Sequence, residues 1–222
     1  AECVDLLKQA DVVVTNPPFS VFREYVAQLV AADKKFVIIG NMNAVTYKEI
    51  FPLIMANKLW FGESIHSGDR EFRVPDDYPL NAANCREEDG IKYLRIKGVR
   101  WYTNIKISKF REDIPLYKYY SPEEYPRYDN YDAIEVGKTA EIPCDYYGVM
   151  GVPITFLDKY NPSQFEIIGI TDRQNTSGLR TKKYSASDSP NYNDLNARSV
   201  LRVGDKYKPT YARLLIRRRK HD

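Results

Sequence analysis

The residues with the clearest chemical potential form the tetrapeptide Asn16-Pro17-Pro18-Phe19. The Asn16 side chain offers a carbonyl acceptor and an amide donor, and each proline keeps a carbonyl acceptor but has no backbone N–H and a fixed φ. Together they predict a rigid corner rich in acceptors. The Asn16 side-chain oxygen and the Pro17 carbonyl could accept both hydrogens of a planar exocyclic amine while Phe19 stacks on its ring.

Such an amine is a poor nucleophile, because its lone pair is delocalised into the ring. Acceptors that hold both hydrogens out of the ring plane also stabilise the positive charge that develops on nitrogen. The barrier to attack on an electrophilic methyl group is thereby lowered. Direct displacement needs no covalent protein nucleophile. No Cys lies beside the tetrapeptide, which argues against methylation of the cytosine ring, since that reaction needs a thiolate.

The tetrapeptide resembles the Asp/Asn/Ser-Pro-Pro-Tyr/Phe motif of amino-directed DNA methyltransferases, in the Asn-Pro-Pro-Phe form that is usual for adenine. Four longer stretches also resemble the EcoRI-type adenine-specific methyltransferase family, so that the similarity covers most of the chain: residues 36–53, 69–80, 97–104 and 146–173. An ordinary strand-ending turn is the alternative interpretation of the tetrapeptide, because Asn and Pro are common turn formers.

The resemblance implies a site and its ligands. Asn16, Pro17, Pro18 and Phe19 would be catalytic, and Asn16 and Pro17 would also contact S-adenosyl-L-methionine, the methyl donor. The partner would be double-stranded DNA with a flipped adenine. A cognate restriction endonuclease is a further potential partner in a restriction-modification system.

The elements around the tetrapeptide predict an α/β fold. Residues 12–14 are three valines, typical of a parallel strand buried on both faces, and two prolines cannot continue its hydrogen-bond ladder. Ser20 is a candidate N-cap for a helix over 21–32, followed by a second buried parallel strand at 35–40 and a helix over 47–58. We therefore expect the C-terminal part of a Rossmann-like, S-adenosylmethionine-dependent methyltransferase sheet.

No glycine-rich cofactor turn precedes Asp11, although a methyltransferase sheet normally begins with one. We therefore expect residues 1–113 to be a catalytic part that lacks its N-terminal cofactor loop. From residue 114 prolines and tyrosines accumulate, which indicates short strands and loops. We expect a smaller mixed or mostly β target-recognition region at 114–222, with strands at 165–171, 200–203 and 211–216 and a solvated basic terminus at 217–220.

Two segments are candidates for DNA contact. Residues 92–105 predict a hairpin bent at Gly98, in which Trp101 and Tyr102 point to opposite faces, so that one can be core while the other meets a flipped base. A core position for both is the alternative. Residues 172–196 predict a polar loop that orders on DNA, or a plain disordered linker. Four cations on it could neutralise phosphates: Arg173, Arg180, Lys182 and Lys183.

Composition bears on which ligands the protein could bind and on where it is located. The net charge of +3 permits a nucleic-acid partner without requiring one, and the 18 tyrosines fit either a β-rich domain or a base-stacking surface. The three cysteines form no CxxC pair and His66 has no second histidine nearby, so we expect no metal site. No apolar stretch is long enough for a membrane span, and we expect a cytoplasmic protein. The alternative to an active enzyme is a non-catalytic DNA-binding module, or a fragment that lacks the cofactor site and is inactive by itself.

Overall fold

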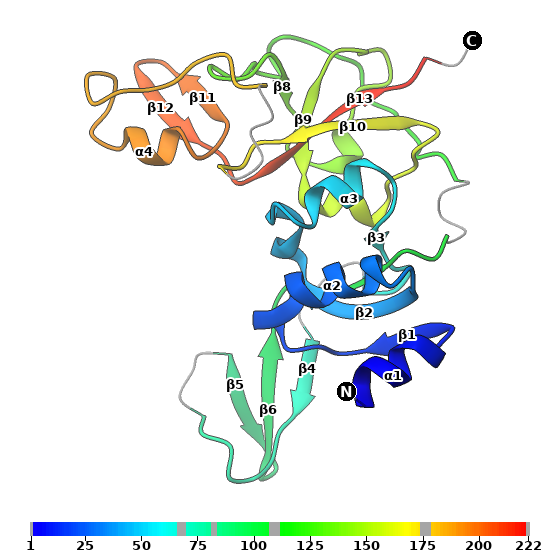
Figure 1. Ribbon diagram of the computed structural model, residues 1–222. Helices are drawn as coiled ribbons and strands as arrows, with labels where there is room; N and C mark the ends of the chain where they lie inside the picture. The colour runs from blue at the N-terminus through cyan, green and yellow to red at the C-terminus, as the bar shows by residue number, and fades with distance from the viewer. Residues whose placement is uncertain (1, 66–69, 81–83, 107–111, 174–178, 221–222) are drawn as a thin grey trace. The chain divides into compact units, whose positions relative to one another are not determined.

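The computed structural model describes residues 2–65, 70–80, 84–106, 112–173 and 179–220 (Figure 1). The chain divides into two compact units. Unit 1 contains residues 1–44 and 61–105, and unit 2 contains residues 45–60 and 106–222. The fold class is mixed α/β, with several sheets.

A four-stranded sheet forms the centre of unit 1. Its strand order is β1-β2-β7-β3, and the helices of the unit are short. The elements are α1 (Glu2–Gln9), β1 (Val12–Thr15), η1 (Phe19–Val21), α2 (Phe22–Ala31), β2 (Lys35–Asn41) and β7 (Val99–Thr103). Two further elements, η2 (Met42–Thr46) and β3 (Trp60–Phe61), contain residues of both units.

The parallel pairing predicted from the two apolar runs is confirmed. Val12 lies opposite Lys35 and Thr15 opposite Ile38, so β1 and β2 run in the same direction. The burial predicted for β1 is wrong, however, because Val12 and Val14 keep 43% and 67% of their surface exposed. β1 is an edge strand of this sheet and alternates between exposed and half-buried residues.

The hairpin predicted at 92–105 does not form. Its two halves become β6 (Ile91–Ile96) and β7, which belong to different sheets. β6 lies between β4 (Arg70–Arg73) and β5 (Cys85–Glu88) in a three-stranded antiparallel sheet, which we call the arm, while β7 pairs with β2. Gly98 has a φ of 66° and its carbonyl accepts a hydrogen bond from Met42 N (2.6 Å). The glycine therefore turns the chain from one sheet into the other.

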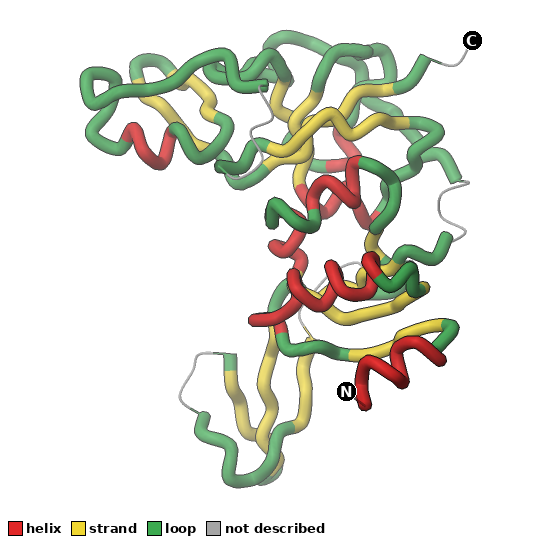
Figure 2. Tube along the Cα trace, viewed as in Figure 1, coloured by secondary structure: helices red, strands yellow, loops and turns green. Residues whose placement is uncertain are grey.

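Unit 2 contains a second four-stranded sheet of order β10-β13-β9-β8, in which β8 and β9 are parallel and the other pairs are antiparallel. Much of the unit is loop, as its prolines predicted (Figure 2). Its elements are α3 (Phe51–Met55), β8 (Ile134–Glu135), η4 (Thr139–Glu141), β9 (Met150–Pro153), η5 (Ile154–Asp158), β10 (Phe165–Ile170), α4 (Tyr192–Leu195), β11 (Val200–Val203), β12 (Lys206–Pro209) and β13 (Arg213–Arg218).

Three predictions for unit 2 need correction. The helix expected over 47–58 is only the five-residue α3, which has Pro52 in its first turn, where the missing N–H costs least. The last strand is β13, two residues later than expected. The basic terminus is not simply solvated: Arg217 pairs with Glu166 (3.0 Å), and the half-buried Arg218 donates to the Cys144 carbonyl and lies 5.1 Å from the Tyr147 ring centre.

Buried polar side chains fix the loops of unit 2. Gln164 accepts from Ile114 N (2.7 Å) and donates to Ile114 O (2.8 Å). Asn130 accepts from Val200 N (2.9 Å) and donates to Arg198 O (2.8 Å). These amides supply the backbone pairing that a longer strand would otherwise provide.

Residues 179–211 form a small module of unit 2 made of α4 and the β11–β12 hairpin, which we call the hairpin module (Figure 1). Tyr184, Leu195 and Val200 form its buried cluster, and Tyr192 and Tyr207 pack against that cluster. Across the described residues, no helix has the length and apolar character needed to cross a membrane.

Candidate functional site

The tetrapeptide Asn16-Pro17-Pro18-Phe19 lies at the carboxyl end of β1. Thr15 pairs with Ile38, and β2 continues in the same direction to Asn41, so Asn16 and Asn41 lie at the same edge of the sheet. Pro18 is extended, with a φ of −55° and a ψ of 132°, and η1 and α2 follow at once. The chain therefore leaves the sheet where ligands bind in open α/β sheets.

The hydrogen bonds of this corner divide its acceptors into two groups. The Pro18 carbonyl accepts from Val21 N (3.1 Å), and the Phe19 carbonyl accepts from the N–H of Phe22. By contrast, the side chain of Asn16 and the carbonyl of Pro17 have no hydrogen-bond partner among the residues that the structure describes. These two acceptors are the ones that the sequence analysis assigned to an amine.

Exposure varies along the tetrapeptide and does not follow this division. Pro17 is buried, whereas Asn16 and Pro18 are exposed and Phe19 keeps 37% of its surface accessible. The predicted N-cap is wrong: Val21, not Ser20, caps α2, and it does so without a side-chain hydrogen bond. The helix begins one residue later than expected, at Phe22, because η1 takes up residues 19–21.

A close contact between Phe22 and Gly40 positions the corner. A Cβ atom placed on Gly40 would lie 2.5 Å from the Phe22 ring, so only glycine lets the first residue of α2 reach β2. Phe22 also packs edge-to-face on Tyr102, with ring centres 5.0 Å apart, and the Tyr102 hydroxyl donates to Asn41 O (2.8 Å). Sequence analysis missed Gly40, although a glycine within a buried strand run signals such an approach.

Two other asparagines, one at each end of β2, have structural roles. Asn41 accepts from Asn43 N through its side-chain oxygen (2.9 Å), which is a turn-forming role. Asn104 donates to Lys34 O (2.8 Å) and accepts from Phe36 N (2.9 Å), so that its amide secures the start of β2.

The structure separates the two aromatic residues predicted to meet DNA. Tyr102 is fully buried and packs against Phe22 and Phe61, so the assignment of Tyr102 to DNA contact is not supported. Trp101, on the opposite face of β7, is half-buried. DNA contact by Trp101 stays a prediction.

The four cations predicted on the 172–196 segment differ in their environment. Arg173 and Lys183 are exposed, although Arg173 donates to Asn193 O (2.9 Å). Arg180 is half-buried, with its guanidinium 5.9 Å from the ring centre of Tyr131. Residues 174–178 lie outside the described residues, and the remainder of the segment is held by specific contacts.

Lys182 belongs to a charged cluster with Asp129 and Tyr184. Its ammonium lies 2.8 Å from the Asp129 carboxylate, which also accepts from the Tyr184 hydroxyl (2.7 Å). Burial raises the pKa of Asp129, but the hydrogen bonds from Lys182 and Tyr184 outweigh this effect and hold that pKa below its usual value. The hydrogen bond to Asp129 raises the pKa of Lys182. Lys182 is therefore committed to a structural ion pair.

A second ion pair lies deeper in unit 2. Arg213 donates to Glu135 through Nε (3.0 Å) and Nη2 (2.6 Å), and both side chains keep only 15% and 11% of their surface exposed. Tyr128 donates its hydroxyl to the same carboxylate. Burial, followed by the charge of Glu135, raises the pKa of Tyr128 well above its usual value, so this hydroxyl stays protonated.

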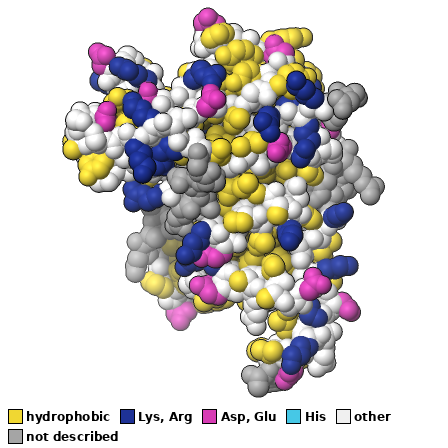
Figure 3. Space-filling model, turned by 45° about the horizontal axis from the view of Figure 1, so that its top comes forward, with side chains coloured by type: hydrophobic (Ala, Val, Ile, Leu, Met, Phe, Trp, Pro, Cys, Tyr) yellow, Lys and Arg dark blue, Asp and Glu magenta, His cyan; other side chains and the backbone are white. Residues whose placement is uncertain are grey.

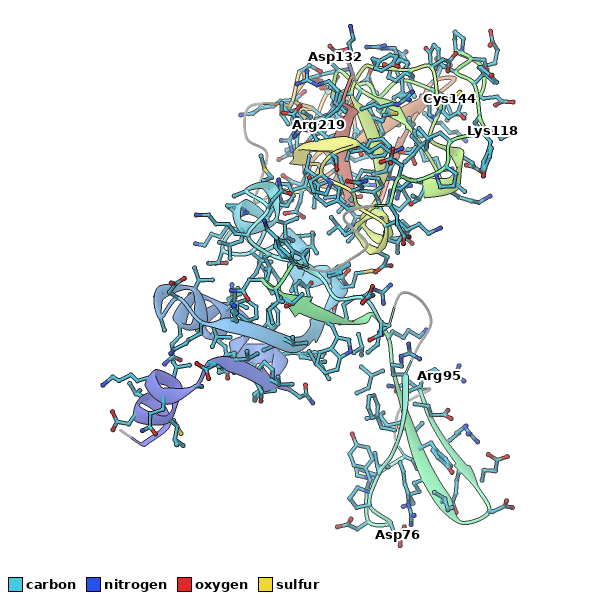
Figure 4. All side chains as sticks on the ribbon, turned by 90° about the vertical axis from the view of Figure 1, so that its right-hand side faces the viewer. Asp76, Arg95, Lys118, Asp132, Cys144 and Arg219 are labelled. Atoms are coloured by element: carbon cyan, nitrogen blue, oxygen red, sulfur yellow. The ribbon has the colours of Figure 1, made fainter. Side chains whose placement is uncertain are left out.

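The arm carries a cavity of 550 Å³. Its charged groups largely satisfy one another, since Arg86 bonds to Glu71 at 2.7 and 2.8 Å and Arg95 approaches the same carboxylate at 3.9 Å. Figure 4 labels Arg95 on the arm. None of its lining residues belongs to the corner. Among the described residues, no group of three or more His, Cys, Asp or Glu side chains could hold a metal ion.

Comparison with known proteins gives a family match over nearly the whole chain. The family described as "Adenine-specific methyltransferase EcoRI" matches residues 1–219. The type II methyltransferase M.EcoRI of Escherichia coli is 52% identical over 171 residues, which are 76% of this chain and 52% of M.EcoRI. The type II methyltransferase M.MpnI of Mycoplasma pneumoniae is 37% identical and is matched over 68% of its length by 100% of this chain.

The chain therefore spans about half the length of M.EcoRI and about two thirds of M.MpnI. No solved structure matches the chain.

Proposed function

The chain belongs to the EcoRI family of adenine-specific methyltransferases, and from this premise we propose that the protein is a site-specific DNA adenine methyltransferase. It would transfer a methyl group to the exocyclic amino group of adenine. The observation that carries the proposal is the state of the corner: the Asn16 side chain and the Pro17 carbonyl have no partner among the described residues, and they lie at the carboxyl end of a parallel strand.

In this mechanism the Asn16 side-chain oxygen and the Pro17 carbonyl accept hydrogen bonds from the two N–H groups of the adenine amine, and Phe19 stacks on the base. The acceptors stabilise the positive charge that develops on nitrogen during attack. Pro18 keeps the corner rigid, because its φ is fixed and its carbonyl is already bonded to Val21. Each proline also removes an N–H that would otherwise repel the amine. No side chain of the protein becomes covalently modified.

S-adenosyl-L-methionine supplies the electrophilic methyl group when it is bound. The residues present fit the methyl-transfer end of such a ligand, because the corner has an exposed Asn16 amide and an exposed aromatic ring. Asn16 and Pro17 are the residues that we propose to contact it. A Rossmann-like arrangement of the sheet is part of the same proposal, supported by the parallel β1–β2 pair and its crossover helix α2.

We further propose that residues 1–113 serve catalysis and residues 114–222 serve target recognition. The mixed sheet and long loops of unit 2 support a recognition role, since loops on a rigid scaffold commonly carry binding residues. A flipped adenine in double-stranded DNA, a cytoplasmic location and a cognate restriction endonuclease complete the proposal.

The test is methyl transfer from labelled S-adenosyl-L-methionine to duplex DNA by the purified full-length protein and by its Asn16→Ala variant. We expect the rate to fall by about 100-fold or more, because loss of one preorganised acceptor at the reacting nitrogen costs on the order of 10² to 10³ in rate. DNA affinity should stay within about twofold, since phosphate contacts carry most of it. Gln28→Ala, which removes another exposed amide from unit 1, is the matched control and should keep full activity.

A wild-type protein that binds DNA but transfers no methyl group under any condition would overturn the proposal in favour of a non-catalytic DNA-binding module. Equal rates for Asn16→Ala and wild type would show that the tetrapeptide is only a turn.

A further inference from the structure

The hairpin module has a charge that sets it apart from the rest of the chain. Residues 179–211 contain seven Lys and Arg against three Asp, a net charge of +4, whereas the whole chain has +3. Figure 3 shows several Lys and Arg side chains gathered over the part of unit 2 that carries this module. The remaining residues together are therefore nearly neutral, and the positive charge of the protein is concentrated in 33 residues.

The cations of the module differ in whether the protein itself provides a partner for them. Several are bonded within the protein: Lys182 pairs with Asp129 (2.8 Å), Arg198 approaches Asp194 (3.4 Å), and Arg202 donates to Gly204 O (3.3 Å). Lys206 and Lys208 are exposed, and neither has an ion pair or hydrogen bond from its side chain to any described residue. These two ammonium groups are available to an external anion.

Strand register places both lysines on one face of the hairpin. Val203 lies opposite Lys206 and Leu201 opposite Lys208, and directly opposed residues share a face. Because residues two apart on a strand are about 6.6 Å apart, Lys206 and Lys208 form a short row of charge along β12. Val203, with 62% of its surface exposed, adds an apolar side chain at the tip.

The opposite face of the hairpin packs against the protein, as does Leu201 at the base of the lysine face. Val200 lies in the buried cluster of the module and Tyr207 packs against it. Asn130 and the backbone of Asp129 bond to Val200, so the base of the hairpin is fixed. The turn residue Gly204 has a φ of 59°, which reverses the chain tightly between the strands. The row of lysines is therefore presented on a rigid support.

We propose that the outer face of the β11–β12 hairpin binds the phosphate backbone of duplex DNA through Lys206 and Lys208. This inference rests on the proposed function, in which DNA is the substrate, and it locates part of the binding surface. Charge complementarity carries it, because a polyanion gains most from cations that have no partner within the protein. In this proposal Lys182 has a structural role in an ion pair, whereas Lys206 and Lys208, which sequence analysis did not single out, contact DNA.

The test measures binding of a fluorescein-labelled 30-base-pair duplex of mixed sequence by anisotropy between 50 and 200 mM NaCl. The full chain is compared with Lys206→Gln/Lys208→Gln and with the control Lys58→Gln/Lys159→Gln. The control removes the same charge from exposed positions of unit 2 outside the module.

Each lost phosphate contact lowers the slope of log affinity against log salt by about 0.9. The hairpin variant should therefore lose about 1.8 from the slope. Its affinity deficit should grow roughly twelvefold as NaCl falls from 200 to 50 mM. The control should keep the wild-type slope to within about 0.3. Melting temperatures of both variants should match wild type, since the four lysines are exposed.

Equal slopes for the hairpin variant and the control would overturn the inference, because the effect would then be net charge alone. An unchanged slope in the hairpin variant would also overturn it. Methyl transfer measured on the same wild-type sample keeps the two proposals apart. A protein with the expected slope change and no transfer activity loses the proposed function but keeps the hairpin as a DNA-binding surface.

Discussion

Two asparagines show how differently the two units use the same side chain. Asn130 of unit 2 is fully buried, and its amide accepts from Val200 N and donates to Arg198 O. Asn16 of unit 1 is exposed, and its side chain bonds to nothing among the described residues. The first amide replaces strand pairing and fixes a loop. The second keeps its acceptor open, which is what recognition of an amine requires.

The two amides differ in the source of their hydrogen-bond partners, which is the folded protein for Asn130 and water or a substrate for Asn16. A buried polar group must be satisfied by the fold itself, because an unmade bond there costs about 1–3 kcal/mol. An exposed amide is satisfied by water and can exchange that water for a substrate. Substitutions of buried polar side chains in unit 2 should therefore act on stability, whereas substitutions at the corner should act on catalysis. The variants below test this separation, from the largest expected change in unfolding free energy to the smallest.

Breaking the Glu135–Arg213 pair should have the largest effect on stability. Arg213→Met leaves the Glu135 carboxylate buried without its cation, and loss of one partner of a buried pair costs about 3–5 kcal/mol. Urea unfolding measures this free energy. Glu135→Gln combined with Arg213→Met should recover part of the loss, because no unpaired charge is then buried. If Arg213→Met alone is as stable as wild type, the ion pair does not contribute to the free energy of unfolding.

The two asparagines can be compared directly. Asn130→Ala leaves the N–H of Val200 and the carbonyl of Arg198 without partners, and we expect a loss of about 2–4 kcal/mol in unfolding free energy. Asn16→Ala should change that free energy by less than about 0.5 kcal/mol, as for most surface substitutions. Similar losses for the two variants would contradict the division between structural and functional amides.

Gly40→Ala should lower both stability and methyl transfer. The added Cβ would lie 2.5 Å from the Phe22 ring, so α2 must move away from β2. Overpacking of this kind costs about 1–3 kcal/mol. Because Phe22 follows the corner by three residues, methyl transfer should fall as well, and thermal denaturation with a parallel activity assay measures both. Gly137→Ala, whose Cβ would approach Glu141 no closer than 3.5 Å, is the control.

The smallest effect depends on pH. The pKa of folded Asp129 lies below its usual value, so its ion pair contributes stability above the pKa of an unfolded Asp, about 3.9, and loses it as pH falls through the folded pKa. Asp129→Asn should cost about 1 kcal/mol or less at pH 7, since Lys182 is partly exposed. Thermal unfolding from pH 7 down to pH 3 should show the wild-type and variant curves converging, and a constant gap would contradict this role.

Local sequence patterns were sufficient for part of the fold. Three valines before two prolines predicted β1 and its end, the spacing of Phe22, Val26 and Leu29 predicted α2, and residues 35–40 predicted β2 as its parallel partner. The errors arose where partners distant in sequence decide. The exposure of Val14 follows from the edge position of β1, and the split at Gly98 follows from the pairing of β7 with β2.

The sequence by itself determined the chemistry of the corner, because covalent structure fixes the acceptors of Asn16 and Pro17 and the rigidity of two consecutive prolines. Only the tertiary structure decided which groups remain open to a ligand. Lys182 and Lys206 are the same residue type in one basic segment, yet one lies 2.8 Å from a carboxylate and the other bonds to no described residue. Hydrogen bonds and ion pairs depend on distances between residues far apart along the chain, and only folding sets those distances.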